Sequence, residues 1–142
     1  MTVLLGIIAV FIILPPGNDL SRMQIEQVTS SVNIKAILSL IASYRKEHSN
    51  QTPSSLTGLI PYADDDLEMF YLPKSRFQQP NGRIDITRLD EISAYELVQG
   101  GQSNIVVREK LGLWGDGTIA IGLSDGTVER LSSEEFQKLH LR

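Results

Sequence analysis

The sequence predicts an α+β protein: a long N-terminal helix, apolar in its first part, packs on a four-stranded antiparallel sheet, and a short helix ends the chain. Three observations predict it. Residues 3–14 are all apolar or glycine, and residues 19–48 carry apolar side chains at helical spacing. In residues 92–131, stretches with the alternating pattern of β-strands are separated by turn residues. A chain of 142 residues fits one domain with its own core. We expect residues 1–17 to be an apolar membrane-anchor segment and residues 18–142 to be an α+β head.

The apolar run reads VLLGIIAVFIIL, and no charged side chain precedes Asp19. As a helix it would extend roughly 18 Å, which is short of the ~30 Å hydrocarbon core of a bilayer. A cleaved signal peptide and a buried element of a soluble domain are the alternatives, but a signal needs a basic start and a small-x-small cleavage site. Neither is present before the Pro-Pro-Gly at residues 15–17, so we expect membrane insertion. The anchoring and helix-packing side chains are Val3, Leu4, Leu5, Ile7, Ile8, Val10, Phe11, Ile12, Ile13 and Leu14.

A second helix is predicted over residues 19–48, after the Pro-Pro-Gly break. Asn18 or Asp19 is the expected N-cap, and Arg45 and Lys46 suit the negative end of the helix dipole. The most apolar stretch, residues 34–44, should pack on the rest of the domain. The apolar positions at helical spacing are Met23, Val28, Val32, Ile34, Ile37, Leu38, Ile41 and Tyr44.

Two short elements are expected in the middle of the chain. Thr52 can cap a short helical element, with Pro53 at its first position and Pro61 as its stop. Residues 69–72 could form a short strand.

The C-terminal half is predicted to form an antiparallel meander followed by a helix. Ile119 and Ile121 should face one side of the sheet, with Ala120 and Gly122 facing the other. An Asp125-Gly126 pair is a strong hairpin signal. A helix over residues 133–140 should begin with a capping box between Ser132 and Glu135, and Leu131 can pack against Phe136. The predicted strands cover residues 92–98, 104–110, 118–123 and 127–131.

Composition excludes several kinds of chemistry. The net charge is −4, from 13 basic and 17 acidic residues, which argues against a nucleic-acid partner. The absence of cysteine excludes disulfides and thiolate sites. His48 and His140 do not form a metal-ligand pair, and the sequence has no phosphate-binding loop. We therefore expect no catalytic residues and no cofactor.

Five aspartates are weak candidates for a Ca²⁺ site: Asp64, Asp65, Asp66, Asp116 and Asp125. They lack the spacing of an EF-hand loop. A solvated acidic loop explains the triple aspartate, and turn formation explains the other two. Trp114, the only tryptophan, could form a binding spot or pack in the core.

A resemblance to a known family rests on five pieces in a fixed order. They are Ile12-Ile13-Leu14-Pro15 at the end of the apolar run, Asn33-Ile34-Lys35-Ala36-Ile37 followed by Leu40 to Tyr44, Pro53-Ser54-Ser55-Leu56, Leu123-Ser124-Asp125-Gly126-Thr127-Val128-Glu129, and Ser132-Ser133-Glu134-Glu135-Phe136. In this order the chain resembles type IV pilin-like and type II secretion pseudopilin-like proteins, particularly those of planctomycetes and verrucomicrobia.

The resemblance implies a non-catalytic structural subunit of a type II secretion or type IV pilus-related assembly. It also implies a single-pass protein of the bacterial inner membrane whose head faces the periplasm. Its partners would be the membrane and other pilin-like subunits, as a homo- or hetero-oligomer. The alternative is a stand-alone membrane-tethered periplasmic module that binds a partner through loops near Asp64 and Trp114. A soluble enzyme is a third class.

The sequence departs from this family at its start. The prepilin motif Gly-Phe-Thr-Leu-x-Glu is missing, and no glutamate precedes Glu26. In the family that glutamate pairs with a neighbour's N-terminal amine, since a carboxylate in lipid is costly unless paired. We expect either that the true start lies upstream of Met1 or that assembly does not use this contact.

Overall fold

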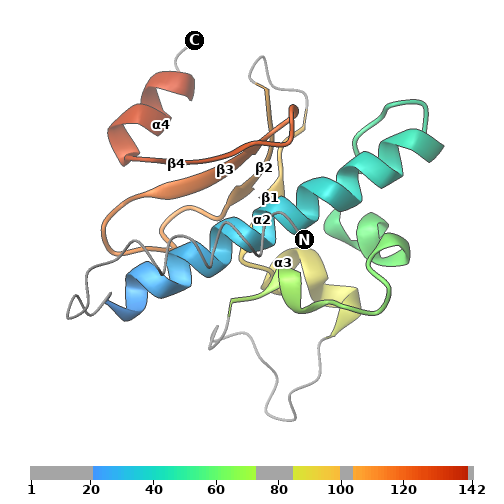
Figure 1. Cartoon of the computed structure of the whole chain (residues 1–142), viewed down its shortest axis with the longest axis horizontal. Helices are drawn as coiled ribbons and strands as arrows, with labels where there is room; N and C mark the ends of the chain where they lie inside the picture. Colours follow the sequence, from blue (N-terminus) through green and yellow to red (C-terminus); the bar gives the residue numbers. More distant parts are fainter. Residues whose placement is uncertain (1–20, 73–84, 100–103, 141–142) are drawn as a thin grey trace, which may run out of the picture.

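The structure, a computed structural model, describes residues 21–72, 85–99 and 104–140 (Figure 1). The four strands form one antiparallel sheet in the order β1-β2-β3-β4, with α2 across one face and α4 on the other (Figure 1). This confirms the predicted α+β fold and its meander. The elements are α2 (Arg22–Glu47), the 3-10 helices η1 (Leu56–Tyr62), η2 (Glu68–Phe70) and η3 (Ile86–Arg88), α3 (Leu89–Ile92), β1 (Tyr95–Leu97), β2 (Ile105–Glu109), β3 (Ile119–Leu123), β4 (Val128–Leu131) and α4 (Ser133–His140).

The first described residue, Ser21, caps α2. Its hydroxyl accepts from the Gln24 backbone N–H at 3.2 Å, and its own N–H donates to the Gln24 side chain at 2.9 Å. This capping box satisfies two otherwise free N–H groups of the first turn. The prediction of Asn18 or Asp19 as the N-cap, with the helix beginning at residue 19, is therefore wrong for α2. The apolar run and the whole of residues 1–17 lie outside the described residues.

The buried face of α2 differs from the predicted apolar stripe. Ile34 and Ile37 are fully buried, as expected. Nearer the start of the helix, however, Gln27 and Ser30 are buried, whereas Val28 and Val32 are only partly so. The physical reason is spacing: residues 27, 30, 34, 37 and 41 recur every three or four positions, which keeps them on the side that meets the sheet.

The prediction for residues 52–61 is partly wrong. The short helix η1 begins at Leu56 after Ser55, and Pro61 lies inside it. Thr52 does not cap it but accepts a hydrogen bond from Arg45 Nη2 at 2.7 Å. Pro61 is tolerated because the fixed φ of proline suits a 3-10 turn.

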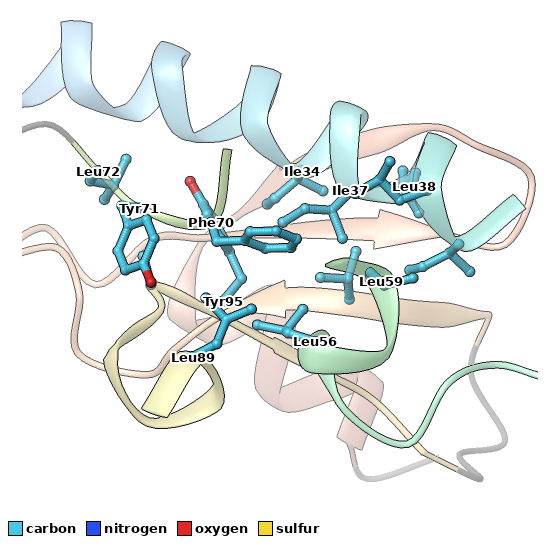
Figure 2. Packing of buried hydrophobic residues seen from close by; sticks show 14 of the residues in the cluster. Ile34, Ile37, Leu38, Leu56, Leu59, Phe70, Tyr71, Leu72, Leu89 and Tyr95 are labelled. Carbon is cyan, nitrogen blue, oxygen red and sulfur yellow. The ribbon is translucent and has the colours of Figure 1, made fainter. Parts of the chain in front are cut away.

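The strand predicted over residues 69–72 is also wrong, because Glu68–Phe70 forms the 3-10 helix η2. Phe70 is fully buried, and its carbonyl accepts from Ala94 N at 3.2 Å and Ser93 Oγ at 2.7 Å. Figure 2 shows the Phe70 side chain among Ile34, Ile37 and Leu56 in the main core. Packing of one aromatic ring, rather than strand pairing, therefore sets the conformation here.

Three of the four predicted strands match the sheet closely. The first begins later than predicted, because Leu89–Ile92 forms α3 and only Tyr95–Leu97 pairs with β2. A shift of register between Ile105 and Val107 marks a bulge in β2. Ile105 therefore packs with Ile119, Ile121 and Phe136 in the small core under α4. Val107 packs on the other face, in the larger core under α2.

The alternation predicted for β3 is confirmed. Ile119 and Ile121 pack with Phe136 of α4, and Ala120 belongs to the core under α2. Gly122 faces α2 so closely that a Cβ there would lie 2.6 Å from Val107 Cγ1 and 2.8 Å from Ile34 Cγ2. Glycine at this position therefore permits the helix to lie tightly on the sheet.

The turn and cap predictions at the C-terminal end are confirmed. Gly126 has a φ of 88°, and its N–H donates to Leu123 O at 2.9 Å in the β3–β4 turn. Ser132 and Glu135 form the predicted capping box, with bonds of 2.8 and 3.2 Å. Together they begin α4 directly after β4 and place Phe136 on the sheet.

Candidate functional site

A fully buried carboxylate, that of Glu109, lies at the end of β2 on the face covered by α2. Oε2 accepts from Trp114 Nε1 at 2.8 Å and from the Ala120 backbone N–H at 2.7 Å. Oε1 accepts from the Ser30 hydroxyl of α2 and from Arg130 Nη2, the latter at 2.9 Å. Arg130 Nη1 adds a second bond to Oε2 at 3.2 Å.

Strand register explains how Arg130 reaches this carboxylate. Tyr95 pairs with Glu109, Ala120 pairs with Arg130, and the pairing of Arg108 with Ile121 puts Glu109 opposite Ala120. The four residues thus form one row across the sheet. Because alanine has only a methyl group, the arginine of β4 can extend over it to meet the glutamate of β2.

The arginine also ties the sheet to the first turns of α2. Arg130 Nη2 donates to Gln27 O at 3.1 Å, and the guanidinium lies 5.7 Å from the centre of the Trp114 ring. The Gln27 side chain in turn donates to Asp116 at 2.9 Å and to Thr118 at 3.1 Å. The β2–β3 connection is therefore held against the start of the helix.

Tyr95 extends the network along α2. Its hydroxyl donates to Ser30 Oγ at 3.1 Å and accepts from Asn33 Nδ2 at 3.1 Å. Burial raises the pKa of Tyr95 to about 12, and its hydrogen bonds with Ser30 and Asn33 oppose that rise in pKa. Hydrogen bonds thus run from Asn33 through Tyr95 and Ser30 to Glu109.

The hydrogen bonds of this cluster use the polar atoms of the Glu109 carboxylate fully. An ionised carboxylate offers about four lone-pair positions, and Glu109 already accepts five bonds. It is fully buried, so no substrate can reach it in this conformation. The arrangement neutralises a buried charge and fixes the position of α2 on the sheet.

An apolar pocket of about 460 Å³ lies beside the network, between the β2–β3 connection and α4. Trp114 is shared: its N–H bonds Glu109, and its ring helps to line the pocket. The tryptophan is 7% exposed, so it packs in the core while its ring also lines the pocket. The lining residues are Leu111, Gly112, Trp114, Gly117, Thr118, Ile119, Ser133, Phe136 and Gln137.

The triple aspartate is an exposed turn between η1 and η2. Asp64 and Asp65 adopt positive φ values of 49° and 63°, which aspartate tolerates better than most residues. Asp66 accepts from the Glu68 backbone N–H at 3.2 Å. Turn formation therefore explains why three aspartates occur together here.

Asp116 and Asp125 each close a turn by bonding to the threonine two residues later. Hydrogen bonds from Gln27 and then from Thr118 lower the pKa of Asp116. The side-chain and backbone hydrogen bonds of Thr127 lower that of Asp125. Within residues 21–72, 85–99 and 104–140, the structure brings together no group of three acidic or histidine side chains able to hold a metal ion.

Sequence reasoning missed Glu109, Ser30 and Arg130. One signal was available: Gln27 and Ser30 share the helical stripe of Ile34 and Ile37, so two polar residues had to be buried with partners. The predicted anchor residues lie outside the described part of the chain. Of the helices that the structure does describe, none has both the length and the apolarity to cross a membrane.

Comparison of the chain with known protein families, with curated proteins and with solved structures gives no match in any of the three.

Proposed function

We propose that this chain is a pilin-like or pseudopilin-like structural subunit, without catalytic activity, of a type II secretion or type IV pilus-related assembly. In this proposal the apolar run of residues 3–14 anchors the subunit in the bacterial inner membrane and packs against the same run of other subunits. The head faces the periplasm, and its partners are the membrane and other pilin-like subunits.

One observation carries the proposal: a 26-residue helix lies across an antiparallel meander, and an apolar run precedes that helix in the sequence. Such an arrangement suits a subunit whose head is joined to its anchor at the start of the helix that packs on its own sheet. The resemblance in the order of sequence pieces supports the same reading.

The buried network supports a structural rather than catalytic role. Glu109 and Ser30 are both fully buried and are bonded to each other. Their polar atoms hold α2 against the sheet.

A second candidate function is a stand-alone membrane-tethered module that binds a partner at its head. The pocket between the β2–β3 connection and α4 favours it, because apolar pockets of several hundred Å³ often receive ligands. The two candidates differ in whether the chain assembles with copies of itself or with related subunits.

Cysteine cross-linking tests this difference, since the chain contains no cysteine. Val10→Cys places one thiol in the apolar run. If the chain assembles, oxidation of cell membranes should yield disulfide-linked dimers of this chain, or mixed dimers with a related subunit carrying a matching cysteine. The same variant diluted in detergent is the control and should stay monomeric. A chain that is membrane-bound yet monomeric in every oxidised sample would contradict the subunit proposal and favour the tethered module.

A further inference from the structure

We propose that the pocket end of the head docks on the surface of the lipid bilayer, with Leu111 and the pocket beside Trp114 entering the boundary between headgroups and acyl chains. This rests on the membrane anchorage in the proposed function. It adds an orientation for the head and a lipid-facing surface.

The pocket lies at the end of the head where the chain enters it. Gln27, in the second turn of α2, bonds directly to Asp116 and Thr118 of the β2–β3 connection. Gln27 is six residues after Ser21, so only ~9 Å separates the two along the helix axis. Figure 1 shows the β2–β3 connection and α4 at the same end of the molecule as the start of α2.

Chain length limits how far this end can be from a membrane. Residues 15–20 separate the apolar run from Ser21. Leu14 and Ser21 are seven residues apart, so at most ~25 Å separates them even when the chain between them is fully extended. If residues 3–14 are held in the bilayer, the start of α2 must lie within that distance of the end of the apolar run.

The surface at this end has the chemistry of a lipid contact. Leu111 is 66% exposed and lines the pocket. An exposed leucine beside a pocket with an aromatic wall suits shallow insertion at the interfacial region. The nearby charges do not favour anionic lipid. Lys138 is paired with Glu134 at 3.2 Å, and the lowered pKa of Asp116 keeps its carboxylate negatively charged near neutral pH. The partner we assign is a zwitterionic bilayer surface.

Trp114 reports on this contact directly, because it is the only tryptophan in the chain. The whole chain is reconstituted in phosphatidylcholine vesicles that contain lipid brominated near the start of its acyl chains. We expect bromolipid to quench Trp114 emission relative to vesicles of ordinary phosphatidylcholine. Leu111→Ser should lose most of that quenching.

Ile86→Ser is the matched control. Ile86 is also exposed, at 44%, and its helix η3 adjoins α3, on the opposite side of α2 from α4 (Figure 1). Both substitutions are at the surface, so both variants should fold, and only Leu111→Ser should reduce the quenching. Equal loss in the two variants would overturn the proposed orientation.

Three other results would overturn the lipid contact, and they differ in what else they overturn. A chain that floats with the vesicles while Trp114 stays unquenched would overturn docking and leave anchorage intact. A chain that does not float with the vesicles would overturn anchorage and docking together. Disulfide-linked dimers of a Leu111→Cys variant, without quenching, would assign this surface to a second copy and overturn the lipid contact.

Discussion

The Glu109 carboxylate lies 2.9 Å from the Arg130 guanidinium, across the intervening strand β3 and beneath α2. The glutamate is fully buried and the arginine side chain is 23% exposed. The pair is joined to α2 through the Ser30 hydroxyl and the Gln27 carbonyl. A polar contact of this kind permits one position of the helix on the sheet, whereas apolar packing alone tolerates small shifts.

Glu109→Gln should destabilise the head by about 3 kcal/mol, since removing one partner leaves a largely buried charge uncompensated. The change keeps the size of the side chain, so the loss reports on charge rather than on packing. Urea unfolding of the chain in mild detergent, monitored by Trp114 fluorescence, measures this loss of stability.

Glu96→Gln is the control for that substitution. Glu96 pairs with Arg108 at 2.7 Å but is 39% exposed, so its loss should cost no more than about 1 kcal/mol. Equal costs for the two glutamates would show that Glu109 does not hold the network together.

Gly122→Ala should destabilise the fold by about 1–3 kcal/mol, because the added methyl overlaps Val107 and Ile34 and forces α2 away from β3. Gly115→Ala is matched to it, since a Cβ there meets nothing within 4 Å and its φ is not positive. Thermal unfolding of both variants gives the comparison. A Gly122→Ala variant as stable as the wild type would mean that the helix lies less closely on the sheet than described.

Asp116→Asn should lower stability near neutral pH but not in acid. Hydrogen bonds from Gln27 and then from Thr118 lower the pKa of Asp116. A lowered pKa means that the carboxylate stabilises the fold above the ordinary aspartate pKa, and that this contribution is lost as the pH falls through the lowered value. Urea midpoints of wild type and variant should therefore converge in acid.

Asp65→Asn, in an exposed turn, serves as the comparison for Asp116→Asn and should leave the midpoint near neutral pH unchanged. A difference between wild type and Asp116→Asn that is the same at every pH would contradict the proposed hydrogen bonds to the Asp116 carboxylate.

Tyr95→Phe should cost about 1 kcal/mol below the ordinary tyrosine pKa, through the lost hydrogen bonds to Ser30 and Asn33. Burial raises the pKa of Tyr95 to about 12. The neutral phenol therefore stabilises the fold fully below the unfolded-state pKa of ~10, and this contribution is lost as the pH rises through about 12. Wild type should therefore lose its advantage over the variant between about pH 10 and about pH 12, measured by urea midpoints. A constant difference over that range would contradict the burial of the hydroxyl.

The regular parts of the fold could be predicted from the sequence because local chemistry dictates them. The Asp125-Gly126 turn and the Ser132–Glu135 capping box depend on neighbouring residues alone. The alternation of Ile119 and Ile121 with Ala120 set the two faces of β3 in the same way.

The buried network could not be predicted, because its members come from α2, β2 and β4. Glu109 and Arg130 are 21 positions apart, and their meeting depends on strand register and on the small side chain of Ala120. The 3-10 turn before Tyr71 was missed for a similar reason, since Phe70 is placed by the packing of its ring against residues distant in the sequence and by a bond from Ala94. The pocket likewise depends on how α4 packs, which no local pattern specifies.

The most direct test of membrane anchorage by residues 1–17 is fractionation of cells that express the whole chain or residues 18–142 alone. We predict that the whole chain sediments with membranes and resists an alkaline wash, while the shortened chain stays in the soluble fraction. Equal solubility of the two would contradict the anchor and, with it, the proposed pilin-like subunit.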